Sequence, residues 1–247
     1  VKTHQKKSLY DFFYSFMFND TDVIMLSKHL YDDVADYVPV DNVHICPNGI
    51  PEPEYVKSES HDNSVSLLFL SNLIESKGVF VLLEACQKLK KKGVLFRCTL
   101  IGGEGDVSES QLNRQIKEKG LEGNVVYAGK KFGAEKGKAF SEADIFVFPT
   151  FHETFGLVNL EAMQYSLPIV STPEGGIPDV IDDGRNGYLV PQRDAEALAE
   201  KLEILIKDDE LRKKMGEAGR EKYEASFTLQ KFEERMTEIL THVLQKS

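Results

Sequence analysis

From Ser64 onward the sequence alternates short apolar runs with helical patterns, and this alternation constrains the fold more than any other feature. Six runs are mostly apolar: 65-VSLLFL-70, 94-VLFRCTLI-101, 124-NVVYAG-129, 144-DIFVF-148, 168-PIVS-171 and 187-GYLV-190. The helical patterns between them are 79-VFVLLEACQKLKKK-92, 109-ESQLNRQIKEKG-120, 135-EKGKAFSEA-143 and 156-GLVNLEAMQYS-166. Apolar strands separated by helices are typical of a parallel sheet covered on both faces. The pattern predicts an α/β fold with a doubly wound, six-stranded parallel sheet that binds its ligand at the carboxyl ends of the strands.

The sequence before Ser64 has a different pattern. Four elements are predicted there: a helix over 5–18, a strand over 22–27, a helix over 28–38 and a strand over 42–49. A segment of this length is too short to form a core of its own. We therefore expect residues 1–49 to be the remnant of a separate amino-terminal domain, and the first residue, Val1, also favours a fragment.

Composition suggests the other domain boundaries. The stretch 56-VKSESHDNS-64 is polar and indicates a linker over residues 50–63. Residues 64–224 would then form the sheet domain. The sequence ends in a helical pattern, 228-TLQKFEERMTEILTHVL-244, whose apolar residues recur on one face. Such a helix must pack on another element, so residues 225–247 are interpreted as a separate closing helix.

Charge and cysteine content narrow the function classes. The formal net charge of −10 argues against general nucleic-acid binding, which relies on dense Lys and Arg. Cys46, Cys86 and Cys98 form no CxxC or Cys/His cluster, so they indicate no metal site, and a reducing cytoplasm fits best. The sequence shows no signal peptide and no apolar run near the ~20 residues that span a bilayer.

An aromatic run near the start, 9-LYDFFYSFMF-18, leaves three interpretations open. It can contact the inner face of a membrane, which would make the protein peripheral there. It can face the core of the missing domain, which is the interpretation we favour. If it is exposed, it would favour self-association into a homo-oligomer.

The stretch 148-FPTFHETFGLVNLEAM-163 is mostly apolar and yet carries two carboxylates, Glu153 and Glu161. Glu153 follows a predicted strand, at the edge of the sheet where active sites lie. Glu161 is on a helix that is apolar around most of its circumference, so it must be hydrogen-bonded if it is buried. Carbohydrate hydroxyls are good donors to such groups. The alternative is structural: Glu153 caps the helix, and Glu161 bonds to backbone groups or to an arginine.

Loops after the neighbouring strands carry groups that suit phosphate. Lys77 precedes a helix in 71-SNLIESKG-78, where it can meet phosphate as a point charge. Glycines in 101-IGGEGD-106 and 171-STPEGGIPDV-180 let a ligand approach the backbone. Each feature has an ordinary alternative, a solvated lysine or a plain turn. Together with a free helix amino terminus at Gly156, they predict a cleft for a sugar nucleotide.

These residues resemble a known family. The stretch 153-ETFGLVNLE-161 is similar to the E-x7-E signature of the retaining glycosyltransferases of family 4, also called group 1, which have the GT-B fold. Further similar stretches follow in the family's order: 45-ICPNGIP-51, 67-LLFLSNLIESKG-78, 99-TLIGGEG-105, 125-VVYAGK-130, 144-DIFVFPT-150, 161-EAMQYSLPIVST-172 and 175-GGIPDVIDDGRNGYLV-190. The resemblance covers roughly residues 20–245. It implies a Rossmann-like donor-binding domain, with a closing helix that crosses back to the amino-terminal domain.

The resemblance also implies roles for individual residues. Glu153 and Lys77 would be the catalytic residues: Lys77 neutralises the donor diphosphate, and Glu153 binds hydroxyls of the transferred sugar. Gly102 and Gly103 would let the donor approach the second strand, and Glu161 would bind the ribose hydroxyls. The other donor-binding groups would be the backbone N–H groups of Phe155, Gly156 and Leu157 and, around the nucleobase, Lys130.

The implied function is transfer of a sugar from a nucleotide diphosphate sugar, UDP-sugar rather than GDP-sugar, to an unknown sugar or lipid-linked acceptor. The product would be a surface polysaccharide or another glycan, and neither a metal nor another cofactor is required. Two positions depart from the family: Asn72 replaces the usual Arg, and Asp179 replaces a common Glu. Because Asn72 brings no charge to the diphosphate, a non-catalytic nucleotide-sugar-binding or assembly module is one alternative. Another, a sugar-nucleotide epimerase, is disfavoured by the E-x7-E stretch.

Overall fold

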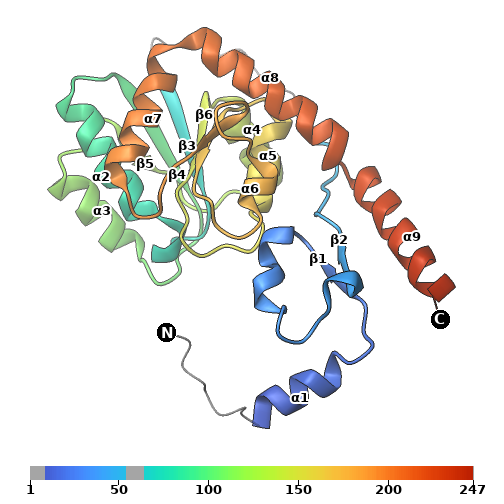
Figure 1. Cartoon of the computed structure of the whole chain (residues 1–247). Helices are drawn as coiled ribbons and strands as arrows, with labels where there is room; N and C mark the ends of the chain where they lie inside the picture. Colours follow the sequence, from blue (N-terminus) through green and yellow to red (C-terminus); the bar gives the residue numbers. More distant parts are fainter. Residues whose placement is uncertain (1–8, 54–63, 247) are drawn as a thin grey trace.

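Figure 1 shows a computed structural model of the chain, which describes residues 9–53 and 64–246. The strands are β1 Val23–Met25, β2 Val43–Ile45, β3 Val65–Leu70, β4 Phe96–Ile101, β5 Val125–Tyr127, β6 Ile145–Phe148, β7 Ile169–Ser171 and β8 Gly187–Leu189. The α-helices are α1 Leu9–Met17, α2 Val79–Lys91, α3 Glu109–Glu118, α4 Gly133–Ser141, α5 Leu157–Gln164, α6 Ile177–Val180, α7 Ala195–Lys207, α8 Asp209–Ser226 and α9 Leu229–Lys246. Short 3-10 helices are η1 Lys28–Asp33, η2 Val40–Asn42 and η3 Glu75–Lys77.

Six strands form one parallel sheet in the order β5-β4-β3-β6-β7-β8. Counted along the chain from β3, this is the order 3-2-1-4-5-6 of the doubly wound dinucleotide-binding fold. The predicted α/β class with a six-stranded parallel sheet is confirmed. β3 pairs with β4 over its full length, Val65–Leu70, but with β6 only through Leu67 and Leu68. The two halves of the sheet therefore meet at a short seam between β3 and β6.

Helices cover both faces of this sheet, as the apolar strands require. In Figure 1, α2, α3 and α7 lie on one face, and α4, α5 and α6 lie on the other. α8 contacts both α5 and α7, so it joins the two helical layers at one end of the sheet.

β6 illustrates how the strands build the core. All four residues of 145-IFVF-148 are buried. The ring of Phe146 lies 5.7 Å from that of Phe140 on α4 and 6.3 Å from that of Phe148. Phe148 in turn lies 6.4 Å from Phe69 of β3. These ring contacts tie a helix and the two strands of the seam into one core, and they place the seam on a rigid base.

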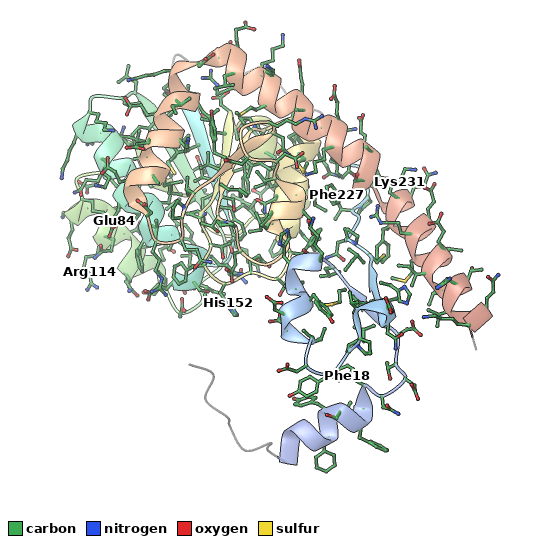
Figure 2. All side chains as sticks on the ribbon, in the orientation of Figure 1. Phe18, Glu84, Arg114, His152, Phe227 and Lys231 are labelled. Atoms are coloured by element: carbon green, nitrogen blue, oxygen red, sulfur yellow. The ribbon has the colours of Figure 1, made fainter. Side chains whose placement is uncertain are left out.

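Residues 9–53 form a small segment beside this domain. β1 and β2 pair in parallel with each other, and of their residues only Met25 is buried. Phe16 of α1 is 77% exposed, whereas Phe18 stacks against Tyr14 and Tyr37 at the far end of the segment (Figure 2). The three interpretations of the aromatic run stay open, and residues 5–8 of the predicted first helix lie outside the described residues.

The predicted helix over residues 28–38 is wrong. Only the 3-10 helix η1, Lys28–Asp33, forms, with the hydroxyl of Ser27 accepting a hydrogen bond from the His29 N–H at 3.0 Å. Aspartates compete with the backbone for hydrogen bonds and disfavour helix interiors, and this stretch has three of them. Pro39 then disfavours helical backbone at the residue before it.

α9 runs from the sheet domain along the small segment (Figure 1). The guanidinium of Arg235 donates to the Pro47 carbonyl at 3.0 Å, and the rings of His242 and His44 lie 5.9 Å apart. No residue of α9 is buried. The helix therefore crosses to residues 44–47, but its apolar face is only partly covered. The proposed boundary at residues 224–225 falls inside α8, and residues 54–63 of the proposed linker lie outside the described residues.

Among the described helices, none has both the length and the hydropathy needed to cross a membrane.

Candidate functional site

A cavity of about 450 Å³ lies at the seam between β3 and β6. In this fold, ligands bind at the carboxyl ends of the strands where the strand order reverses. Ser71, after β3, and Glu153, after β6, both line the cavity, and α5 contributes Glu161 from the side. Leu26 and Asn48 of the small segment line it as well. The cavity is therefore built by both regions of the chain.

Lys77 and Glu153, the two residues predicted to be catalytic, form an ion pair. The Lys77 ammonium lies 3.0 Å from a Glu153 carboxylate oxygen and 2.8 Å from the carbonyl of His152. Both side chains are only about 20% exposed. The next residue, Gly78, has a φ of 82°, and a Cβ there would lie 2.0 Å from the Pro149 carbonyl oxygen. This close approach of the loop after β6 is what brings Lys77 to Glu153.

The other oxygen of Glu153 accepts hydrogen bonds from backbone N–H groups just before α5. They come from Thr154 at 2.9 Å and from Phe155 at 3.4 Å. Glu153 thus partly caps the helix, as the structural alternative expects, and the Phe155 N–H already has a hydrogen-bond partner within the protein. The N–H groups of Gly156 and Leu157, by contrast, donate to no acceptor within residues 9–53 and 64–246. Two donors at the positive end of α5 are therefore available to an anion or a hydroxyl.

Asn72, Gly103 and Lys130 converge at the ends of β3, β4 and β5. A Cβ on Gly103 would lie 3.2 Å from Lys130 Cδ and 3.4 Å from Asn72 Oδ1. A Cβ on Gly102 would lie 1.7 Å from the Ser71 carbonyl oxygen, so only glycine fits at this position. These residues lie at the same edge of the sheet as the seam cavity. None of them is among the described residues that line that cavity. The Lys130 ammonium lies 4.8 Å from the centre of the Phe132 ring.

Tyr127 supports this glycine turn. Its hydroxyl donates to the Gly102 carbonyl at 2.7 Å. Burial, followed by the nearby carboxylates Glu109 and Glu104, raises the pKa of Tyr127. The hydroxyl therefore keeps its proton and remains a donor that holds the turn.

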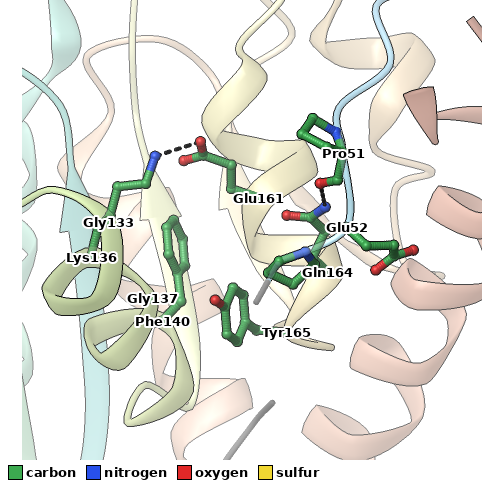
Figure 3. A pocket seen from close by; sticks show the side chains of 10 residues that line it. Pro51, Glu52, Gly133, Lys136, Gly137, Phe140, Glu161, Gln164 and Tyr165 are labelled. Carbon is green, nitrogen blue, oxygen red and sulfur yellow. Dashed lines mark hydrogen bonds and ion pairs between the residues drawn. The ribbon is translucent and has the colours of Figure 1, made fainter. Parts of the chain in front are cut away.

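Glu161 is bound by a lysine that the sequence reading missed. The Lys136 ammonium, from α4, lies 2.6 Å from Glu161 Oε1. Figure 3 shows this ion pair at the rim of a second cavity of about 290 Å³, between α4, α5 and residues 51–53. Among the described residues, Glu161 has neither a backbone partner nor an arginine, the two partners of the structural alternative. A signal existed, because Lys136 follows Gly133 by three residues and precedes Phe140 by four, and so lies on the inward face of its helix.

Asn159 was also missed. It is fully buried in α5, and neither polar atom of its side chain has a hydrogen-bond partner among the described residues. A Cβ on Gly156 would lie 2.7 Å from Asn159 Nδ2. The amide therefore lies directly beneath the loop that holds Glu153, and nothing in the apolar pattern of this helix predicts its position.

Asp179 joins α6 to the small segment. Its carboxylate accepts a hydrogen bond from the Ser27 hydroxyl at 2.6 Å and lies 3.4 Å from His29 Nε2. A third cavity, of about 610 Å³, opens beside this contact and is lined by His152, Glu153 and residues of β1 and η1. His152 lies at this edge of the domain, facing the small segment (Figure 2). Within the described ranges, no three His, Cys, Asp or Glu residues are grouped so that they could hold a metal ion.

Comparison with known proteins identifies the family. The model of the family described as "Glycosyl transferases group 1" matches residues 52–222. The chain is 35% identical over 175 residues to the amylovoran biosynthesis glycosyltransferase AmsK of Erwinia amylovora, covering 67% of this chain and 42% of AmsK. It is 29% identical over 190 residues to the capsular polysaccharide biosynthesis glycosyltransferase CapM of Staphylococcus aureus, covering 76% of this chain and 48% of CapM. The chain thus spans less than half the length of these relatives.

Solved structures share the fold. A glycosyltransferase from Rickettsia africae superposes with a TM-score of 0.86 at 22% identity, covering 100% of this chain and 69% of that one. Anabaena HepE, solved with UDP and glucose, superposes with a TM-score of 0.77 at 20% identity, covering 89% of this chain and 62% of HepE. The match to the family model extends over more than half of the sequence, so the chain belongs to the group 1 glycosyl transferases.

Proposed function

We propose that the chain is the donor-binding half of a retaining glycosyltransferase of family 4. It would transfer a sugar from a nucleotide diphosphate sugar, UDP-sugar rather than GDP-sugar, to a sugar or lipid-linked acceptor. The observation that carries the proposal is the convergence of Lys77, Glu153 and Glu161 around the seam of the sheet. The names of AmsK and CapM support a role in surface polysaccharide biosynthesis, and HepE with UDP and glucose supports the donor class.

The chemical step needs two kinds of stabilisation, one for the leaving diphosphate and one for the positive charge on the sugar. Lys77 supplies the first once a phosphate replaces Glu153 as its partner. The free N–H groups of Gly156 and Leu157 add donors at the positive end of α5. Glu153, released from Lys77, binds sugar hydroxyls. This design uses no metal or other cofactor, and Lys130 with Gly102 and Gly103 borders the nucleobase side.

Calorimetry on the chain tests the donor site. We expect UDP to bind more tightly than GDP. Lys77→Met and Glu161→Gln should each weaken UDP binding by at least about tenfold, since a hydrogen bond to a charged group contributes roughly 1.5–3 kcal/mol. Lys88→Met is the control, because Lys88 pairs with Glu196 on the outer helices α2 and α7. Absence of binding by both nucleotides would contradict the proposal.

Asn72 favours a second candidate, a non-catalytic nucleotide-sugar-binding or assembly module. An amide at this position contacts the Gly103 turn but adds no positive charge to the diphosphate site. Such a module would bind the donor and leave it intact. Transfer or hydrolysis of a UDP-sugar by the complete polypeptide would eliminate this candidate. We place the complete protein in the cytoplasm, peripheral to the inner face of the membrane, and an assay of membrane fractions checks that placement. Homo-oligomerisation through the aromatic run would show in the mass of the chain in solution.

A further inference from the structure

Glu161 lines two cavities at once. It contributes to the cavity at the seam of the sheet and to the second cavity between α4 and α5. Lys136 lies on the side of the second cavity and binds Glu161 Oε1 at 2.6 Å (Figure 3). The pair therefore stands in the wall that separates the two cavities.

This ion pair differs from a neighbouring pair that also uses a lysine of α4. Lys138 and Glu142 are four residues apart, 3.7 Å from each other, and 72% and 59% exposed. Lys136 and Glu161 come from different helices and are only 33% and 25% exposed. Exposed pairs contribute little because water competes with them. The more buried pair is shielded, so it can fix the position of both side chains.

Lys136 occupies one oxygen of the carboxylate and leaves the other available. Within residues 9–53 and 64–246, Glu161 Oε2 accepts no hydrogen bond. An ionised carboxylate has about four acceptor positions on its two oxygens, so a ligand hydroxyl can still bind. A side chain that is already fixed binds with less loss of conformational entropy than a free one.

We infer that Lys136 is a positioning residue: it holds the Glu161 carboxylate so that the carboxylate accepts hydrogen bonds from the ribose hydroxyls of the bound nucleotide. Lys136 therefore determines how strongly the site distinguishes ribose from a sugar that lacks these hydroxyls. The inference rests on the proposed function, because it takes a nucleoside diphosphate to be the ligand of the seam cavity.

Calorimetry with UDP and with 2′,3′-dideoxy-UDP tests the inference. The wild-type chain should prefer UDP. Lys136→Met should weaken UDP binding by about tenfold, because the freed Glu161 side chain must be ordered when the ligand binds, while binding of the dideoxy compound changes little. Lys136→Arg keeps the cation and should retain most of the preference. In a Glu161→Gln chain, adding Lys136→Met should have almost no further effect on UDP binding.

Lys138→Met is the matched control, since it removes the same charge from the same helix. Melting temperatures without nucleotide measure any purely structural contribution of each lysine. If Lys136→Met lowers the melting temperature but leaves the preference for UDP unchanged, the inference is overturned while the proposed function stands. If the wild-type chain binds neither UDP nor GDP, the proposed function fails and the inference fails with it.

Discussion

The described part of the chain contains two parallel sheets that are stabilised in different ways. Every residue of β6 is buried in the larger sheet, whereas in β1 and β2 only Met25 is buried. The larger sheet lies between two helical layers and has its own core. The smaller sheet is attached to the rest of the chain by hydrogen bonds. The Ser27 hydroxyl donates to Asp179, and the Arg235 guanidinium donates to the Pro47 carbonyl. The seam cavity is lined by residues of both regions. Its shape therefore depends on the well-packed sheet domain and on how the small segment is attached to it.

The largest expected effect is a difference in unfolding free energy between a substitution in the large sheet and one in the small sheet. Phe69→Ala empties a site that is 0% exposed and should lower the free energy of unfolding by about 3–5 kcal/mol. Ile24→Ala removes a side chain of β1 that is 40% exposed and should cost less than about 1 kcal/mol. Urea denaturation followed by circular dichroism measures both. Equal losses would mean that the two regions share one core.

The next effect concerns the contact between η3 and the loop after β6. Gly78→Ala combines a left-handed backbone, which costs about 1–2 kcal/mol, with overlap on the Pro149 carbonyl, which costs about 1–3 kcal/mol. Gly93→Ala is the matched control, because Gly93 has a similar φ of 73° and nothing within 4 Å of the added Cβ. The difference between the two unfolding free energies isolates the overlap. No difference would show that the loop can shift without cost.

A smaller effect probes the tether between the regions. The Tyr223 hydroxyl of α8 donates to the Ile50 carbonyl at 2.9 Å and accepts from the Gln164 amide at 2.8 Å. Tyr223→Phe removes both hydrogen bonds, but the Ile50 carbonyl keeps the Leu229 N–H at 3.0 Å and the Gln164 amide keeps the Pro51 carbonyl at 2.7 Å. The cost should therefore be about 0.5–1.5 kcal/mol for each lost bond. Tyr188→Phe is the comparison, since no partner is found for its hydroxyl within the described ranges. A neutral Tyr223→Phe would mean that the remaining partners of Ile50 and Gln164 are sufficient.

The smallest effect depends on pH and is confined to the small segment. His44 donates to Asp22 at 2.7 Å, and this hydrogen bond, reinforced by Lys246, lowers the pKa of Asp22 below 3.8 although burial opposes it. A lowered pKa stabilises the folded chain fully above the unfolded value, and the gain is lost as pH falls through the folded value. Melting curves of wild type and Asp22→Asn should differ above pH 3.8 and converge in stronger acid. Asp41→Asn, which removes one exposed carboxylate from the same region, is the control for the change in net charge.

The parts that sequence could predict are those that local pattern controls. The six apolar runs predicted the strands because most strand residues are buried, although the edge strand β5 leaves Val126 59% exposed. Lys77 and Glu153 could be placed near each other because both lie in loops that follow strands of one parallel sheet. The helix over 28–38 failed because its aspartates and Pro39 override a weak periodicity. Lys136 and Asn159 were missed for another reason. Spacing along α4 indicates only that Lys136 faces inward, because its partner Glu161 lies 25 residues away on another helix. Asn159 is a polar residue within an apolar helix, and no local pattern marks its burial.

The short seam between β3 and β6 has a consequence for how such a protein can change over generations. The opening at the seam follows from the strand order, because the loops after β3 and β6 lead to opposite faces of the sheet. The core beneath, with Phe69 against Phe148, does not depend on what the loops carry. Substitutions at loop residues such as Asn72 can therefore change ligand specificity with little effect on the stability of the fold.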